Sequence, residues 1–395
     1  MSAEPVPNPR SAPDLAVEAL NAVLRAQYLG APLTIVDSGP GAGKTELVEL
    51  VAAQEAAILL GRALIVTQTN EQACDVAARF ASRFPSVPCA LRVRETLEVP
   101  ATVTAAPQLV LARDWRSLPS GPGVFIANAA LWSFLDPHDA EPFSVQIIDE
   151  AYQLPDFRFH QIAQLGVRKV LVGDPGQILP ILPKELERWK CEPAGPHVPC
   201  PQAMRVRFPQ IRPVNLPITR RLPLDTVAVV QPAFYPSLPF VATAGAGARR
   251  LQAADGGTSL EDRAIDRALA GESIVHLTLP PFAIGEVDVL AAETIVRLLN
   301  ALFARSASTL DDGRVIALTP RQVGVVCAHQ AQATEVLSRL NGAAVDVLVE
   351  TADSFQGLER AVMIVHHPLS GRSAADNFHA DAGRLCVMMS RHRVS

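Results

Sequence analysis

A short glycine-rich loop carries the residue types that bind phosphate. Residues 38–45 read Ser-Gly-Pro-Gly-Ala-Gly-Lys-Thr, between a strand-like run at 33–37 and a helical pattern. Glycines let backbone N–H groups point inward around phosphate oxygens, and the N-terminus of the next helix adds partial positive charge. A lysine at 44 can then reach the β- and γ-phosphates, and a threonine at 45 can ligate Mg²⁺. We therefore expect ATP and Mg²⁺ at a site built from Gly39, Gly41, Ala42, Gly43, Lys44 and Thr45.

The first position of this loop departs from the usual pattern, because Ser38 stands where a glycine is common. That position tolerates small residues, so the departure has little weight. The competing interpretation is a chance glycine-rich turn. The strand and the helix on either side argue against it.

Two neighbouring carboxylates supply the second part of this chemistry. Asp149 and Glu150 follow the apolar run 145–148, and ligand sites of parallel sheets lie at the carboxyl ends of the strands. Asp149 would hold the Mg²⁺ shell, and Glu150 would orient and deprotonate the attacking water. An acidic pair after a strand is by itself often a solvated turn. The phosphate-binding loop upstream favours the catalytic interpretation.

Strand-like apolar runs alternate with helical patterns, which predicts parallel βα units and an α/β fold. In the first half we expect strands at 33–36, 63–66, 124–126, 145–148 and 170–172, with helices at 46–57 and 71–82. In the second half we expect strands at 273–277, 323–326, 345–349 and 362–365, with a helix at 287–304.

A proline-dense stretch, 191–217, separates the two series of elements. We predict a disordered tail over 1–14, a first domain over 15–211 and a second domain over 212–395. The glycine- and alanine-rich run 242–257 is typical of an exposed loop.

Charge and cysteine content limit the partners and the compartment. The net charge of −5 is not the basic balance common in nucleic-acid binders, so a binding footprint would be a local groove. Of the six cysteines, four lie in apolar or helical stretches, which is typical of reduced thiols in the cytoplasm. Cys191, His197 and Cys200 lie in a proline-rich loop whose spacing is poor for zinc, so a surface loop is the favoured interpretation. No apolar run is long enough to cross a membrane.

The acidic segment Asp149-Glu150-Ala151-Tyr152-Gln153 resembles motif II of superfamily-one helicases. The subgroup is the one, moving 5′ to 3′, that includes the nonsense-decay RNA helicases and the replication helicase-nucleases. Six further stretches resemble the family's motifs in the same order: 69–73 (motif Ia), 173–177 (motif III), 216–221 with 234–235 (motif IV), 323–332 (the strand and turn before motif V), 351–360 (motif V) and 384–393 (motif VI). The resemblance covers residues 30–395.

The resemblance implies two RecA-like parallel-sheet domains with the ATP site in the cleft between them. It implies that Arg221 and Arg391, from the second domain, stabilise the charge that develops on the γ-phosphate. Gln177, at the end of a first-domain strand, would sense the γ-phosphate and the attacking water. Glu359 would contact the ribose or phosphate region. The competing interpretation for either arginine is a surface ion pair.

The resemblance also implies single-stranded DNA or RNA as the partner of a monomeric protein. Thr69, Asn70, Thr351 and Ser354 would contact phosphates and sugars, which carry no sequence information. The alternative for Thr69 and Ser354 is that they only cap helices.

Three features depart from the family pattern. Leu24 stands where a glutamine usually reads adenine, so Gln27 would have to serve from a shifted position. Ala328-His329 replaces a proline–aromatic pair whose ring supports single-strand stacking. The accessory domains that help to separate strands are missing. The chain also stops shortly after Arg391, so we expect either a fragment or an open edge on the second sheet.

Three functions compete at this point. The leading one is a nucleic-acid-stimulated ATPase that moves along a single strand and unwinds duplexes. The second is an ATP-gated switch that clamps nucleic acid or a partner without processive unwinding. The third is a helicase-derived module without hydrolysis, which the presence of Lys44, Asp149, Glu150, Gln177 and Arg391 disfavours.

Overall fold

The chain divides into two compact units. The computed structural model describes residues 11–106, 108–139, 141–180, 188–280, 287–367, 369 and 378–395. Unit 1 comprises Met1–Pro175 and Leu179–Pro217, and unit 2 comprises Gly176–Ile178 and Ile218–Ser395. Residues 212–217, which the sequence placed in the second domain, therefore belong to unit 1. The reason is that Val214–Leu216 forms the edge strand of its sheet, beside the strand that carries the phosphate-binding loop.

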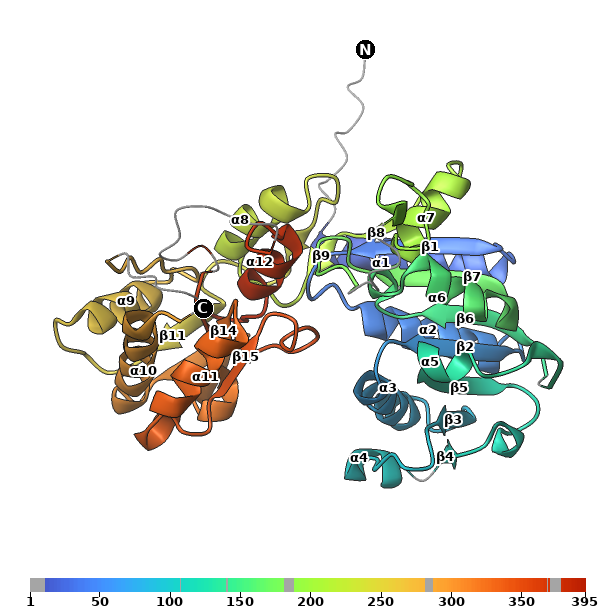
Figure 1. Cartoon of the computed structure of the whole chain (residues 1–395), viewed down its shortest axis with the longest axis horizontal. Helices are drawn as coiled ribbons and strands as arrows, with labels where there is room; N and C mark the ends of the chain where they lie inside the picture. The colour runs from blue at the N-terminus through green and yellow to red at the C-terminus, as the bar shows by residue number, and fades with distance from the viewer. Residues whose placement is uncertain are drawn as a thin grey trace, which may run out of the picture. The chain divides into compact units, whose positions relative to one another are not determined.

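Unit 1 is built on an eight-stranded sheet in the order β4-β3-β5-β2-β6-β7-β1-β8, in which every pairing is parallel (Figure 1). The strands are β1 (Leu33–Ser38), β2 (Arg62–Thr67), β3 (Cys89–Arg92), β4 (Leu109–Ala112), β5 (Gly123–Asn128), β6 (Phe143–Ile148), β7 (Gly166–Gly173) and β8 (Val214–Leu216). The five predicted strands and the α/β fold are confirmed. The prediction missed β3, β4 and β8, which have only three or four residues each.

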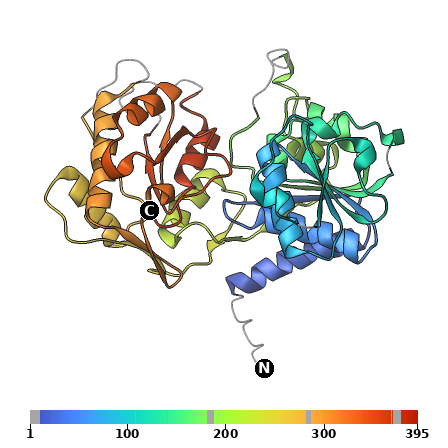
Figure 2. The ribbon, with the colours of Figure 1, turned by 90° about the horizontal axis from the view of Figure 1, so that it is seen from below.

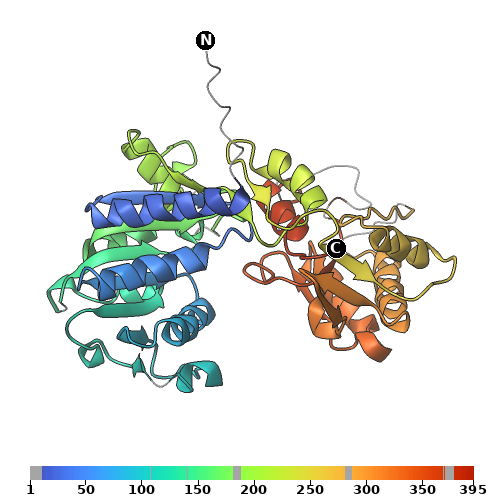
Figure 3. The same cartoon turned by 180° about the vertical axis from the view of Figure 1, so that it is seen from behind.

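Helices cover both faces of this sheet, because neighbouring strand residues point to opposite sides. Within β1, Val36 joins the core against one set of helices and Ile35 joins the core against the other. The first set is α1 (Ala12–Tyr28), α2 (Lys44–Ala57) and α3 (Asn70–Arg83), which Figure 3 shows along one side of the strands. The second set is α5 (Ala129–Trp132), α6 (Asp156–Ile162) and α7 (Cys200–Arg207); α4 (Ala101–Thr104) follows β3.

The predicted disordered tail over 1–14 is too long at its C-terminal end. Residues 1–10 lie outside the described part of the chain. Helix α1 already begins at Ala12. Its start is fixed by a capping box, in which the Ser11 side chain accepts a hydrogen bond from Asp14 N and the Asp14 side chain accepts one from Ser11 N.

Unit 2 contains a three-stranded parallel sheet in the order β15-β14-β16 and a separate antiparallel sheet in the order β11-β12-β13. The parallel strands are β14 (Val323–Cys327), β15 (Leu348–Thr351) and β16 (Val362–Val365). The antiparallel strands are β11 (Arg249–Gln252), β12 (Ser308–Asp311) and β13 (Arg314–Ala317), and a short parallel pair joins β9 (Ile218–Thr219) to β10 (Val241–Ala242).

The central strand β14 of unit 2 is buried on both faces. Val325 packs in a core with α9 (Leu260–Leu269), α10 (Val289–Ala304) and α11 (Gln330–Arg339), whereas Val326 packs in a core with α12 (Ala382–Met389). Helix α8 (Leu224–Phe234) packs near α12 in a further cluster. Figure 2 shows helices, coloured yellow to red, on both sides of the strands of this unit.

Two element predictions for unit 2 are wrong. Residues 273–277 form no strand; instead the Ser273 hydroxyl lies 2.6 Å from the Thr226 hydroxyl in a buried pair. The run 242–257 is not simply an exposed loop, because it contains β11, in which Arg249 and Leu251 are buried. The predicted helix 287–304 and the strands 323–326 and 362–365 are confirmed, and the strand predicted at 345–349 lies at Leu348–Thr351.

The last residues of the chain run beside β16. Arg360 and His392 form a parallel bridge, and Met363 N donates to Ser395 O at 2.8 Å. An open edge on the second sheet was one of the two expectations from the sequence, but this side of β16 is partly paired. No helix in the described ranges is both long enough and apolar enough to cross a membrane.

Candidate functional site

The predicted catalytic segments of unit 1 follow three strands that are neighbours in its sheet. The phosphate-binding loop follows β1, Asp149 and Glu150 follow β6, and Asp174 follows β7, which lies between the other two. Because parallel strands end at the same edge, the three loops are placed side by side. The order of strands therefore assembles residues that are distant in sequence.

The loop after β1 has the backbone conformation that its glycines permit. Gly41 has φ 70° and Gly43 has φ 90°, a left-handed region that other L residues rarely adopt. Helix α2 starts directly after Gly43, at Lys44, so its free N–H groups lie at the loop. Ser38, which replaces the usual first glycine, donates its hydroxyl to Gly173 O at 3.1 Å and so ties the loop to the end of β7.

Lys44 lies between two carboxylates of the neighbouring loops. Its Nζ is 3.6 Å from Glu150 Oε1 and 3.9 Å from Asp174 Oδ2, and the residue is 9% exposed. The sequence identified Lys44 and Glu150 but gave no role to Asp174, which is 1% exposed. Asp174 directly follows a buried strand, as Asp149 follows β6. This position was the feature of the sequence that could have identified it.

Thr45 and Asp149 offer oxygen atoms of the kind that Mg²⁺ prefers. The Thr45 hydroxyl is 3.4 Å from Asp149 Oδ2. Burial, with the Glu150 carboxylate next, raises the pKa of Asp149 to about 7. A divalent cation would relieve that electrostatic cost, and Mg²⁺ is commonly bound by few protein ligands together with substrate phosphates. The donor set therefore fits Mg²⁺.

Glu150 has a strained backbone. Its φ of 49° and ψ of 45° lie in the left-handed region, which is unusual for a residue other than glycine or asparagine. Such strain costs roughly 1–3 kcal/mol and is concentrated at functional sites. The turn is fixed by a bond from Glu150 N to Asp149 Oδ1 at 2.9 Å. The strained turn supports the assignment of Glu150 as a functional residue.

A second layer supports the loop after β6. Tyr152 donates its hydroxyl to Asp37 Oδ1 at 2.8 Å, and Arg205 of α7 forms an ion pair with Asp37 Oδ2. Cys200 is buried at the start of α7 and donates to Ala151 O at 3.4 Å. The part of the predicted surface loop that contains Cys200 is therefore core. The described residues include no group of three or more potential metal-ligating side chains.

Gln27 does not lie where an adenine reader is needed. Its Nε2 donates to Thr34 Oγ1 at 2.8 Å, and its backbone oxygen accepts from Arg168 at 2.7 Å. Thr34 is near the start of β1, whereas the phosphate-binding loop follows the end of that strand. The shifted role considered for Gln27 is therefore wrong, because its side chain serves the core of unit 1.

The predicted nucleic-acid contacts of unit 1 lie at the end of β2. Thr69 caps α3 by accepting from Gln72 N at 3.2 Å, which supports the capping role. Asn70 Oδ1 accepts a 2.7 Å bond from Asn128 Nδ2, at the end of β5. The two asparagines thus form a polar pair across adjacent strand ends.

In unit 2, the predicted contacts Thr351 and Ser354 lie together at the end of β15, with their hydroxyl oxygens 3.4 Å apart. No helix follows Ser354, so its capping alternative is wrong. The ring of His329 stacks on Phe378, with centroids 4.9 Å apart and an angle of 22° between planes. An aromatic ring from a distant segment thus accompanies the histidine that replaced the usual aromatic residue.

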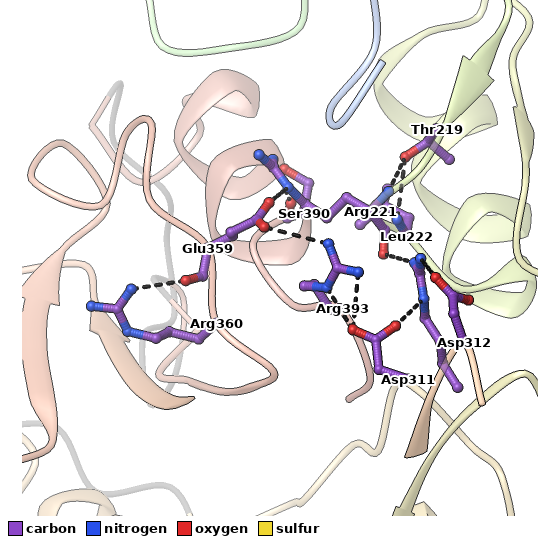
Figure 4. A network of polar contacts seen from close by, with 10 residues as sticks. Thr219, Arg221, Leu222, Asp311, Asp312, Glu359, Arg360, Ser390 and Arg393 are labelled. Atoms are coloured by element: carbon purple, nitrogen blue, oxygen red, sulfur yellow. Dashed lines mark hydrogen bonds and ion pairs between the residues drawn. The ribbon is translucent and has the colours of Figure 1, made fainter. Parts of the chain in front are cut away.

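Arg221 and Glu359 contact each other in unit 2. Arg221 Nε donates to Glu359 Oε2 at 2.7 Å, and Arg221 Nη1 donates to Ser390 O at 3.3 Å (Figure 4). Burial raises the pKa of Glu359, but Arg221 and Arg393 outweigh it and hold that pKa below its ordinary value. The Arg221 side chain is only 13% exposed. Its ion pair with Glu359 therefore differs from the exposed surface pair that was the competing interpretation.

Arg391 and Gln177 are also buried. Arg391 is 1% exposed, and its backbone oxygen accepts from Arg360 N at 2.9 Å. Gln177 lies beyond the end of β7, which stops at Gly173, and it packs with unit 2 rather than with the first domain. Its Oε1 accepts from Gln356 Nε2 at 3.4 Å, next to motif V residues.

The structure thus places the predicted site residues in two groups, each within one unit. In unit 1 these are Gly39, Gly41, Ala42, Gly43, Lys44, Thr45, Asp149 and Glu150, with Thr69 and Asn70 at a neighbouring strand end. In unit 2 these are Gln177, Arg221, Thr351, Ser354, Glu359 and Arg391.

Comparison with known proteins gives a family match in unit 2. The model of an AAA domain matches residues 288–395. No curated protein shows significant similarity to the chain.

Solved structures that resemble the chain are helicases, at low identity. Arterivirus nonstructural protein 10, a helicase solved with DNA, is 13% identical with a TM-score of 0.47, and the match covers 96% of this chain and 61% of that chain. The helicase of PRRSV is 14% identical with a TM-score of 0.44, covering 95% of this chain and 53% of the viral one. A Pif1 helicase is 13% identical with a TM-score of 0.42, covering 95% and 89%. The chain thus spans about three fifths of the arterivirus protein.

Proposed function

We propose that the chain hydrolyses ATP and couples hydrolysis to movement along single-stranded DNA or RNA and to duplex unwinding. The observation that supports this most is the group of charged residues at the ends of β1, β6 and β7. Lys44 Nζ lies 3.6 Å from Glu150 Oε1 and 3.9 Å from Asp174 Oδ2, beside a loop with phosphate-binding geometry. A solvated turn would not bury Lys44 and Asp174 to this extent.

The candidate site residues of the two units divide the chemistry among them. The loop N–H groups and Lys44 bind the phosphates, and Thr45 with Asp149 would hold Mg²⁺, which supplies charge neutralisation on the β- and γ-phosphates. Glu150 accepts the proton of the attacking water, because its side chain stays 20% exposed while its backbone is held in a tight turn. Arg221 and Arg391 stabilise the developing γ-phosphate charge, and Gln177 senses it.

Single-stranded nucleic acid is the proposed partner. Its support is that uncharged polar side chains gather at strand ends in both units. Asn70 with Asn128 does so in unit 1, and Thr351 with Ser354 does so in unit 2. Hydroxyl and amide groups of this kind contact phosphates and sugars.

Several finer assignments belong to the same proposal. The helicase would belong to the 5′-to-3′ subgroup of superfamily one that includes the nonsense-decay and replication enzymes. It would act as a monomer in the cytoplasm, where the six free thiols stay reduced.

The test is the rate of phosphate release with Mg²⁺ and ATP, alone and with single-stranded DNA or RNA. We expect hydrolysis that either polymer accelerates. A rate of hydrolysis that neither polymer changes would contradict the coupling of hydrolysis to nucleic acid. A complete lack of hydrolysis would contradict the proposal that the chain is an enzyme.

A second candidate is an ATP-gated clamp that does not unwind. One observation favours it: the described residues between α3 and β5 form β3, α4 and β4, each of four residues, and one 3₁₀ turn, with loops between them. These described elements are too short to form a separate domain that parts two strands. Strand displacement on 5′- and 3′-tailed duplexes distinguishes the two, because the clamp predicts stimulated hydrolysis without displaced strand.

A further inference from the structure

Five charged residues of unit 2, namely Arg221, Arg249, Asp311, Glu359 and Arg393, form a ring of contacts that closes through the backbone oxygen of Arg221. Asp311 lies on β12 and contacts neither Arg221 nor Glu359 directly within the ring. Its Oδ1 accepts from Arg249 Nε at 2.8 Å, and its Oδ2 accepts from Arg393 Nε at 2.9 Å. Arg249 also donates to the backbone oxygen of Arg221, and Arg393 also contacts Glu359, which itself pairs with Arg221. Figure 4 shows Arg393 between Asp311 and Glu359.

One arm of the ring acts on the backbone of Arg221. Arg249 Nη1 donates to Arg221 O at 2.7 Å, and the Arg249 side chain is only 3% exposed. The turn that carries Arg221 is fixed from the other side, because Thr219 Oγ1 accepts from Arg221 N and from Leu222 N, both at 3.2 Å. The backbone of Arg221 is therefore bonded on both sides.

The other arm acts on the side chain of Arg221 through Glu359. Arg393 Nη1 is 3.5 Å from Glu359 Oε1, and the second oxygen of Glu359 accepts from Arg221 Nε at 2.7 Å. A guanidinium has five N–H donors. The Arg221 guanidinium uses two of these donors for its bonds to Glu359 and Ser390. Other donors of the Arg221 guanidinium can therefore bind a phosphate oxygen.

We propose that Asp311 is a positioning residue for Arg221, and that the hairpin β12–β13 is part of the ATP-hydrolysing apparatus. This inference rests on the proposed function, because it assigns Arg221 to the γ-phosphate. An arginine on a loop loses about 2 kcal/mol of side-chain entropy when it is fixed. If the ring already holds Arg221 in place before ATP binds, part of this entropy is lost on folding and does not add to the barrier of the chemical step.

The ionisation and burial of Asp311 support a positioning role over a random surface pairing. Three arginines face Asp311 and Glu359 within the ring, and Asp312 pairs with Arg249 from outside it. Burial raises the pKa of Asp311, but Arg393 and Arg249 outweigh it and keep that pKa below its ordinary value. Asp311 therefore stays ionised at neutral pH. Because its side chain is only 19% exposed, solvent screens these pairs less than it would on an open surface.

Asp311→Asn tests the proposal, because it removes the charge and keeps the shape. We expect the ATP kcat to fall on the order of 10-fold, less than the loss of an arginine finger, while the ATP KM stays within about twofold. Asp311→Glu should restore most of the rate. The matched control is Asp312→Asn, since Asp312 contacts Arg249 from a side chain that is 57% exposed, whereas Arg393 pairs with Asp311 and Glu359. An equal loss of kcat in Asp312→Asn, or unchanged kcat in a folded Asp311→Asn, would overturn the proposal.

A second measurement separates this inference from the proposed function. The ¹H–¹⁵N signal of Arg221 Nε, assigned with Arg221→Lys, should shift or broaden in Asp311→Asn and stay unchanged in Asp312→Asn. If the wild type hydrolysed no ATP, the proposed function would fail, and this signal would still decide whether Asp311 positions Arg221. An unchanged Arg221 signal in Asp311→Asn would overturn the positioning claim whatever the hydrolysis rate.

Discussion

The two units build their candidate sites by different physical means. In unit 1 the functional groups extend from the ends of adjacent parallel strands, so the sheet itself places Lys44, Asp149 and Asp174. In unit 2, Arg221 and Arg393 lie on loops, and their positions depend on ion pairs with Glu359 and Asp311 from separate segments. A site of the first kind depends on the backbone and on a few charges. A site of the second kind depends on a network in which each member affects the others.

This difference predicts different consequences of mutation. Changes in unit 1 should abolish nucleotide binding or the chemical step. Changes in unit 2 should spare nucleotide binding and reduce turnover or stability.

Lys44→Ala should have the largest effect. It removes the ammonium group that lies between the carboxylates of Glu150 and Asp174 and that would bind the phosphates. We expect nucleotide affinity to fall on the order of 10²-fold or more, measured with a fluorescent ATP analogue. The control is Lys169→Ala, because Lys169 pairs with Leu33 at the far end of β1 and donates to Gly166 O. Comparable weakening by both variants would contradict the site.

Glu150→Gln should bind ATP and fail to turn it over. The amide keeps the size of the side chain but cannot accept a proton from water. We expect phosphate release to fall by up to about 10⁴-fold, with analogue binding kept. Glu141→Gln is the matched control, since Glu141 pairs with Arg62 at the start of β2. Normal hydrolysis by Glu150→Gln would show that another group is the general base.

Arg391→Ala should reduce turnover by about 10³-fold while leaving analogue binding close to that of the wild type, as the loss of an arginine finger does. Because Arg391 is buried, its unfolding midpoint should be measured in parallel, together with Arg391→Lys. Arg339→Ala removes an arginine that pairs with Glu293 and Glu335 on a helix surface and should leave turnover unchanged. If Arg391→Ala lost nucleotide binding instead, the contrast between the units would fail.

The smallest predicted effect concerns pH and the stability of unit 2. Burial lowers the pKa of His392 to about 4, with Arg221 adding to the shift and Asp225 opposing it, and His392 Nε2 lies 2.7 Å from Thr226 Oγ1. Below pH 6.5 the unfolded state binds a proton that the folded state does not, so stability falls as pH decreases towards 4. Between pH 7 and pH 5 the free energy of unfolding should drop by about 2 kcal/mol from this group.

Hydrogen exchange measures this effect by unit. Amides of α8 and α12 in unit 2 should exchange faster at pH 5 than at pH 7 after correction for intrinsic rates, and His392→Gln should remove most of that change. An identical pH response in His392→Gln would mean that other groups cause it.

Local sequence was sufficient for most of unit 1. Apolar runs gave five of the eight strands, and the loop at 38–45 together with Asp149 and Glu150 gave the core of its site. Asp174 was missed because its role depends on β7 lying between β6 and β1, which is a property of strand order. The role of Ser38 depends on the same neighbour, Gly173.

Unit 2 was less predictable because its site depends on contacts between distant segments. Nothing in the sequence near Arg221 indicates that Asp311 and Arg249 are close to it. The antiparallel strands that carry these residues are four residues long, and one of them lies in a run that reads as an exposed loop. The packing of Gln177 with unit 2 was missed for the same reason.

Single-turnover phosphate release with Mg²⁺ and ATP tests the central claim most directly, in the wild type, Lys44→Ala and Lys169→Ala, each with and without a single-stranded oligonucleotide. The account predicts that the oligonucleotide accelerates the wild type and Lys169→Ala alike and that Lys44→Ala stays inactive in both conditions. Release by Lys44→Ala at the wild-type rate, or a wild type that releases no phosphate in either condition, would contradict it.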